Sequence, residues 1–209
     1  MSTITEIKPQ KNKKRVNIYL DGKFASGLDL ENYIKEKLKV GDELSDEEVK
    51  TIVEKSEFTK TYEKLLRFAT LRPRSKKEID DWFYKRQVHT SIQDKLIRKL
   101  EKLRLYDDEE FARWWVQQRI NFRPRGKKLL RIELSQKGVK KDVVEDVMAE
   151  LDNEIDEYEI AKKMMQKNSY KWDKYDTKEK KMKASLFLAR KGISWEVIKE
   201  VTSLELFDE

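Results

Sequence analysis

Residues 123–151 read RPRGKKLLRIELSQKGVKKDVVEDVMAEL, and residues 72–100 read RPRSKKEIDDWFYKRQVHTSIQDKLIRKL. The two stretches align without a gap at an offset of 51 residues, and a further offset of 54 brings residues 177–205 into line. The first two share Arg-Pro-Arg-x-Lys-Lys, and all three carry one apolar run, a turn and a second apolar run. Recurrence at a fixed period predicts an array of helix–turn–helix units.

A further amphipathic helix precedes each helix pair, the first of them over residues 61–70. Units of about 50 residues are typical of stacked arrays, in which neighbouring repeats complete each other's cores. We therefore expect a mainly α protein of tandem three-helix repeats forming an elongated array. The predicted segments are an N-terminal region at 1–58 and repeats at 60–105, 107–152 and 156–205.

The N-terminal region has a different pattern. Residues 15–26 read RVNIYLDGKFAS, in which apolar side chains alternate with polar ones up to Asp21-Gly22. Alternation ending in Asp-Gly predicts a β-hairpin with a type I′ turn. Ile4 and Ile7 supply a third short strand, so we expect a small β-hairpin/helix region with β structure confined to about residues 3–27.

Local capping signals mark the ends of several helices. Residues 29–38 are expected to form a short helix, and Ser45 with Glu48 forms a capping box that opens another. Gly138 and Gly192 stand where a left-handed C-terminal cap is expected.

The composition excludes a disulfide scaffold, a thiolate metal site and a cysteine nucleophile. The chain has 42% charged residues, 10% aromatic residues, 6 Gly, 3 Pro and no Cys, which favours a helix-rich protein without disulfides or thiolate chemistry. The single histidine, His89, lies in a predicted turn, where a solvated or helix-capping role is expected. We find no catalytic constellation in the sequence and predict no enzyme activity and no metal site.

The distribution of apolar residues argues against membrane insertion. No apolar stretch approaches the roughly 20 residues of a membrane span, and residues 1–14 lack an apolar signal-peptide core. We therefore expect a cytoplasmic protein without membrane association. Its formal net charge of +7 favours an anionic partner.

Two basic clusters stand at the start of corresponding helices. Lysines in a first turn oppose the helix macrodipole, so replacing them with glutamate should leave stability equal or higher. Free N–H groups flanked by four cations form a natural anion site, and a solvated charge run is the alternative. The third unit lacks Arg-Pro-Arg, which assigns any such site to the first two units. The candidate partner-binding residues are Arg72, Arg74, Lys76, Lys77, Arg123, Arg125, Lys127 and Lys128.

The stretches YDDEEFARWWVQQR (106–119) and RGKKLLRIELSQKGV (125–139) resemble the regulatory protein RecX family, the modulators of the RecA recombinase. The resemblance is dense over residues 60–152, extends to the N-terminal hairpin, and is weaker in the third unit. The matching residues are Asp107, Asp108, Phe111, Ala112, Trp115, Val116, Arg119, Gly126, Leu130, Glu133, Leu134, Lys137, Gly138 and Val139.

The resemblance implies a three-helix-repeat protein that lies along the groove of the RecA–DNA filament and restrains filament growth, ATP hydrolysis and strand exchange. It implies a role in DNA recombination, DNA repair and the SOS response, without a cofactor or an activity of its own. We expect a monomer, with single-stranded DNA as a second candidate partner. The alternative is a direct nucleic-acid-binding protein of helix-turn-helix type.

Overall fold

The computed structural model describes residues 1–11 and 13–204. Internal contacts divide the chain into two compact units. The first comprises Met1–Arg72 and Gln87–Lys102, and the second comprises Pro73–Arg86 and the chain from Leu103 onward. The predicted first repeat, 60–105, has helices in both units, so its existence as one bundle stays a prediction.

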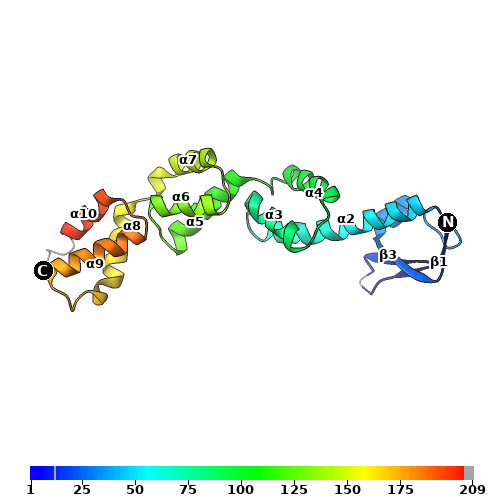
Figure 1. Cartoon of the computed structure of the whole chain (residues 1–209), viewed down its shortest axis with the longest axis horizontal. Helices are drawn as coiled ribbons and strands as arrows, with labels where there is room; N and C mark the ends of the chain where they lie inside the picture. The colour runs from blue at the N-terminus through cyan, green and yellow to red at the C-terminus, as the bar shows by residue number, and fades with distance from the viewer. Residues whose placement is uncertain (12, 205–209) are drawn as a thin grey trace. The chain divides into compact units, whose positions relative to one another are not determined.

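The first unit contains a four-stranded antiparallel sheet with the strand order β3-β2-β1-β4 (Figure 1). The strands are β1 Ser2–Pro9, β2 Arg15–Leu20, β3 Lys23–Asp29 and β4 Glu43–Leu44. Asp21 and Gly22 join β2 to β3 with φ values of 50° and 76°, the positive angles that a type I′ turn needs. The predicted hairpin and its third strand are confirmed.

The strand β4 lies outside residues 3–27, where all β structure was expected, so that boundary was wrong. Its two residues pair with Ser2 and Thr3 at the start of β1. A two-residue strand has no alternation of apolar and polar side chains to detect. Only the return of the chain to the edge of β1 makes this segment a strand.

Two helices follow the sheet strands of the first unit. The helix α1, Leu30–Glu36, is capped by Asp29 and ends at Lys37, which has a left-handed φ of 55°. The helix α2, Asp46–Thr70, opens with the predicted capping box of Ser45 and Glu48. It runs unbroken for 25 residues, whereas the sequence suggested a separate helix from residue 61. No Gly or Pro interrupts this stretch, so nothing ends the helix there.

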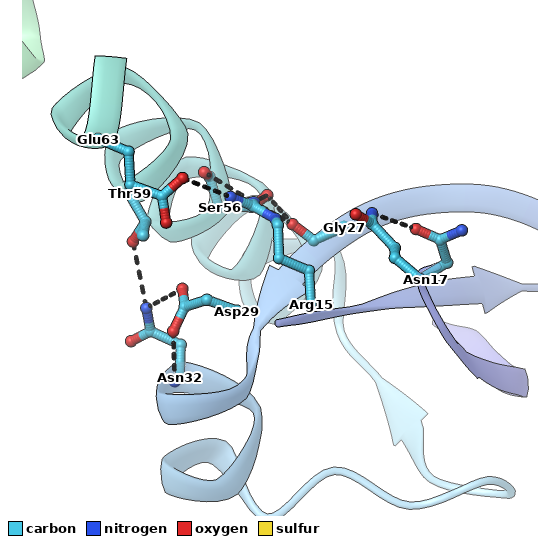
Figure 2. Close-up of polar contacts among 9 residues, drawn as sticks. Arg15, Asn17, Gly27, Asp29, Asn32, Ser56, Thr59 and Glu63 are labelled. Carbon is cyan, nitrogen blue, oxygen red and sulfur yellow. Dashed lines mark hydrogen bonds and ion pairs between the residues drawn. The ribbon is translucent and has the colours of Figure 1, made fainter. Parts of the chain in front are cut away.

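The sheet and α1 are fastened to α2 by polar contacts (Figure 2). The Arg15 guanidinium donates to the Gly27 carbonyl (2.5 Å) and the Ser56 hydroxyl (3.2 Å). The Asn32 amide donates to the Thr59 hydroxyl at 3.2 Å. The apolar residues buried beneath these contacts include Ile4, Val16, Ile18, Leu28, Leu44 and Ile52.

The helix α4, Thr90–Lys102, completes the first unit and contacts α2. The Lys99 ammonium lies 4.5 Å from the centre of the Tyr62 ring. The His89 Nδ1 accepts the Ser91 backbone N–H at 3.3 Å, so the helix-capping interpretation of His89 is confirmed.

The described residues of the second unit form helices and turns, with no strand. Figure 1 shows α5, α6 and α7 grouped together, and α8, α9 and α10 grouped together; each group encloses its own buried apolar cluster. The helices are α3 Lys76–Lys85, α5 Asp108–Phe122, α6 Lys127–Gln136, α7 Lys141–Glu150, α8 Glu157–Asn168, α9 Thr177–Arg190 and α10 Trp195–Leu204, with single 3-10 turns at Asp152–Glu154 and Ser169–Lys171.

The helices α6 and α9 end in the same left-handed cap. Gly138 and Gly192 both have a φ of 82°. The N–H of Val139 donates to the Leu134 carbonyl at 3.2 Å, and the equivalent bond from the residue after Gly192 measures 3.3 Å. This six-to-one bond is characteristic of the Schellman motif. The predicted glycine caps are confirmed, and the offset of 54 residues relates equivalent structural positions.

Candidate functional site

The N-termini of α3 and α6 are closed by carboxylates from later in the chain. The Lys76 N–H donates to Asp108 at 2.9 Å, and the Lys127 N–H donates to Glu157 at 2.6 Å. Asp108 is 9% exposed and Glu157 is 8% exposed. The expectation of free N–H groups at these N-termini was wrong, because acidic side chains 32 and 30 residues away fill the place of an external anion.

Asp108 and Glu157 occupy corresponding places, because each lies in the first turn of the first helix of a repeat. Asp108 caps α3, and Glu157 caps α6, the second helix of the preceding three-helix domain. Glu157 also accepts the Ser194 N–H at 3.1 Å, just before α10. Sequence reasoning missed Glu157, although Asp156-Glu157 repeats the Asp107-Asp108 pair that it had found.

Members of the first basic cluster are engaged within the protein. The Arg74 guanidinium lies 3.9 Å from the Glu78 carboxylate. The Lys77 ammonium donates to the last carbonyl of α6 at 3.3 Å, and the Lys76 ammonium lies 5.3 Å from the centre of the Tyr106 ring. Lys76 and Lys77 nevertheless remain exposed.

The second basic cluster divides into paired and exposed residues. The Lys127 ammonium lies 2.5 Å from the Asp152 carboxylate, and Arg125 Nε lies 3.7 Å from a Glu133 oxygen. Arg123 and Lys128 are exposed. Arg72, in the first cluster, is half-buried and belongs to a different compact unit from Arg74. The eight candidate residues therefore do not form two equivalent anion-binding sites at the starts of α3 and α6.

Most residues of the RecX-like motif have structural roles, as helix caps, close backbone contacts or core residues. Asp107 caps α5 by accepting the Glu109 N–H at 2.9 Å. A Cβ on Gly126 would lie 2.1 Å from the Gly192 carbonyl oxygen, so a side chain at this position would collide with the neighbouring backbone. The motif residues buried in the core of the second repeat are Phe111, Ala112, Val116, Leu130, Leu134 and Val139.

The polar motif residues form one network. Glu133 accepts the Trp115 indole N–H at 2.9 Å and the Arg119 Nε at 2.6 Å. The Lys137 ammonium lies 4.9 Å from the centre of the Trp115 ring and 2.9 Å from Glu78 in α3. The network ties α5 to α6 and α6 to α3, so these side chains bind one another.

The described residues contain no group of three or more His, Cys, Asp or Glu side chains placed to hold a metal ion. Within the same part of the chain, none of the helices has the length and apolar character needed to cross a bilayer. The chemical groups that the structure does bring together are arginines, lysines and carboxylates at the junctions between helices.

Three family models match separate parts of this chain. The regulatory protein RecX N-terminal domain matches residues 2–45. The second three-helix domain of RecX matches residues 107–148, and the third matches residues 154–202.

Relatives resemble the chain over nearly its whole length. The regulatory protein RecX of Bacillus subtilis is 34% identical over 95% of this chain and 75% of the relative. That of Clostridium beijerinckii is 30% identical over 100% of both chains. A crystal structure of regulatory protein RecX superposes with a TM-score of 0.74 at 26% identity, covering 97% of this chain and 100% of the other. The chain belongs to the RecX family of regulatory proteins.

Proposed function

We propose that this protein regulates a RecA recombinase as an inhibitor, by binding along the RecA–DNA filament and modulating its ATP hydrolysis and strand exchange. The observation that carries the proposal is the match to RecX domains over residues 2–45, 107–148 and 154–202. In this proposal the protein acts as a monomer in the cytoplasm. Light scattering of the purified chain tests the monomer.

The junctions between repeats support binding to a periodic partner. A protein that follows a filament needs contact surfaces at a maintained spacing. Buried carboxylate caps join successive repeats at Asp108 and at Glu157, and hydrogen bonds to charged groups are among the stronger polar contacts in proteins. These caps maintain the spacing of surfaces carried by the second and third repeats.

The exposed cations are the best candidates for contact with the filament. Arg123 and Lys128 are exposed beside the start of α6, and Lys76 and Lys77 are exposed at the start of α3. We assign the filament contact to these four residues. Of the other candidates, Arg74, Arg125 and Lys127 lie near carboxylates of the protein itself.

A charge-reversal experiment tests this assignment. Arg123→Glu with Lys128→Glu should raise the protein concentration needed to inhibit DNA-dependent ATP hydrolysis by RecA. The matched control is Lys140→Glu with Lys141→Glu, since both lysines are exposed at the start of α7. The difference should shrink at high salt, because exposed charges are screened over about 8–10 Å.

The outcomes separate the function from the site. If the unmodified protein leaves RecA ATP hydrolysis and strand exchange unchanged, the proposed function is wrong. If it inhibits, but both double variants inhibit equally well, only the assignment of Arg123 and Lys128 is wrong.

A direct nucleic-acid-binding function is the second candidate. Residues 157–204 contain twelve Lys and Arg against seven Asp and Glu, an excess suited to phosphate contacts. A salt titration with single-stranded DNA, with and without RecA, distinguishes the two functions. Tight binding with a steep salt dependence in the absence of RecA favours the second.

A further inference from the structure

Two junctions in the second compact unit are built from corresponding residues. The junction between α3 and α6 contains Arg74, Glu78 and Lys137. The repeat offsets of 51 and 54 residues give, for the junction between α6 and α9, the residues Arg125, Leu129 and Lys191. The two cations are retained in the second junction, and the carboxylate between them is replaced by a leucine.

The first junction is internally neutralised. Glu78 lies 2.9 Å from the Lys137 ammonium and 3.9 Å from the Arg74 guanidinium. The Glu78 side chain is 15% exposed. One largely buried carboxylate therefore serves two cations, which come from consecutive repeats.

The second junction gathers cations without a carboxylate at that position. The Gly126 N–H donates to the Lys191 carbonyl at 2.9 Å, which holds the segment carrying Arg125 against the end of α9. Burial lowers the pKa of Lys191, and the positive charges of Arg125, Lys171 and Arg190 lower it further. Arg190 is the last residue of α9 and Lys191 is its C-cap, so the bond from Gly126 places Arg125 beside the helix end that carries both.

The carboxylates nearby are committed to other partners. Arg125 Nε lies 3.7 Å from Glu133, but Glu133 already accepts hydrogen bonds from Trp115 and Arg119. Glu157 accepts two backbone N–H groups at the same junction. The positive charge of the four cations thus exceeds what the surrounding carboxylates supply.

We propose that Arg125, Lys171, Arg190 and Lys191 form a binding site for the backbone phosphates of a single-stranded nucleic acid, with a bound phosphate supplying the negative charge that Glu78 supplies in the first junction. Arg125 and Lys191 are half-buried, and Lys171 and Arg190 are exposed, so an oxyanion can reach these side chains from solvent. This site rests on the second candidate function, direct nucleic-acid binding, and its test needs only the chain and the nucleic acid.

The neighbouring aromatic residue favours a nucleic acid over an acidic peptide. Tyr170 is 67% exposed, and the Lys171 ammonium lies 5.6 Å from the centre of its ring. Alternation of phosphate-binding cations with an exposed ring is the arrangement that holds stacked single-stranded bases. A lone carboxylate would neutralise one cation, whereas successive phosphates contact several.

The test restores the missing carboxylate in the full-length chain. Leu129→Glu should place a carboxylate between Arg125 and Lys191, raise the Lys191 pKa measured by NMR, and weaken binding of a fluorescent oligothymidylate. Losing one charged contact corresponds to about tenfold in affinity, and the slope of log K against log salt should fall by about 0.7. The matched control is Ile132→Glu, the same change at a 43% exposed position of the same helix.

A second variant guards against a folding defect. Arg190→Gln with Lys191→Gln retains the Lys191 backbone carbonyl and should weaken oligothymidylate binding about 100-fold, because two charged contacts are lost. Equal affinities for Leu129→Glu and Ile132→Glu, or unchanged affinity in the glutamine variant, would overturn the site. Displacement of the oligothymidylate by a glutamate-rich peptide at lower concentration than by unlabelled oligothymidylate would overturn the choice of a nucleic acid.

Discussion

The buried carboxylate of Glu157 should be essential to the stability of the junction between the second and third repeats. Glu157→Ala removes the acceptor of the Lys127 N–H at 2.6 Å and of the Ser194 N–H at 3.1 Å. Leaving a buried donor unpaired costs about 1–3 kcal/mol. Lys127 is half-buried, so water can bind part of the time to its unpaired N–H. We therefore expect the two lost hydrogen bonds together to lower the free energy of unfolding by about 3 kcal/mol.

Urea and thermal unfolding measure this loss. A destabilisation of about 3 kcal/mol lowers Tm by roughly 10 °C in a protein of this size. The fluorescence of Trp172, which is buried against α9 and α10, reports the unfolding of the third repeat.

The control is Glu159→Ala, two residues further along the same helix, where the side chain is exposed. Glu157→Gln retains one acceptor oxygen and should be intermediate between Glu157→Ala and the unmodified protein. Equal unfolding free energies for Glu157→Ala and Glu159→Ala would refute the capping argument.

Three further changes have defined outcomes. Gly126→Ala places a Cβ 2.1 Å from the Gly192 carbonyl oxygen and should cost about 1–3 kcal/mol of unfolding free energy, as overpacked sites do. Burial, together with the charges of Asp81 and Asp108, raises the pKa of Asp80, so the ionised carboxylate is disfavoured in the folded state. Asp80→Asn should therefore stabilise the protein at neutral pH. Unfolding curves should show this gain in stability disappearing as the pH falls through the carboxyl pKa. Lys127→Glu with Lys128→Glu should lower Tm, because Lys127 loses its 2.5 Å ion pair with Asp152 and the new carboxylates stand beside Glu157. An unchanged or higher Tm would mean that the unfavourable interaction of these lysines with the helix macrodipole dominates instead.

Features set by a few neighbouring residues were predictable from the sequence. The Asp21-Gly22 turn, the capping box of Ser45 and Glu48, and the left-handed caps at Gly138 and Gly192 were all identified correctly. Each depends on backbone angles or hydrogen bonds within about six residues. The repeat offsets were also readable, since an amphipathic helix exposes its period in the sequence.

The candidate site was only partly predictable for the same reason. The positions of the first-turn lysines were identified, but their environment depends on Asp108, Glu157 and Asp152, which lie 25–32 residues away in sequence. No local rule relates residues at such a separation. Likewise the unbroken α2 was missed because a polar stretch without Gly or Pro is compatible with either a loop or a helix.

The sequence by itself determined where the turns and helix ends fall, the spacing of the repeats and the positions of the basic residues. Only the tertiary structure decided which of those cations are neutralised and which are open to a partner. Packing brings Glu78 within 2.9 Å of Lys137 at one junction, whereas Leu129, its counterpart by the repeat offset, packs beside Gly192 at the next. Charge is local to a residue, but neutralisation depends on distances that exist only after the repeats have packed.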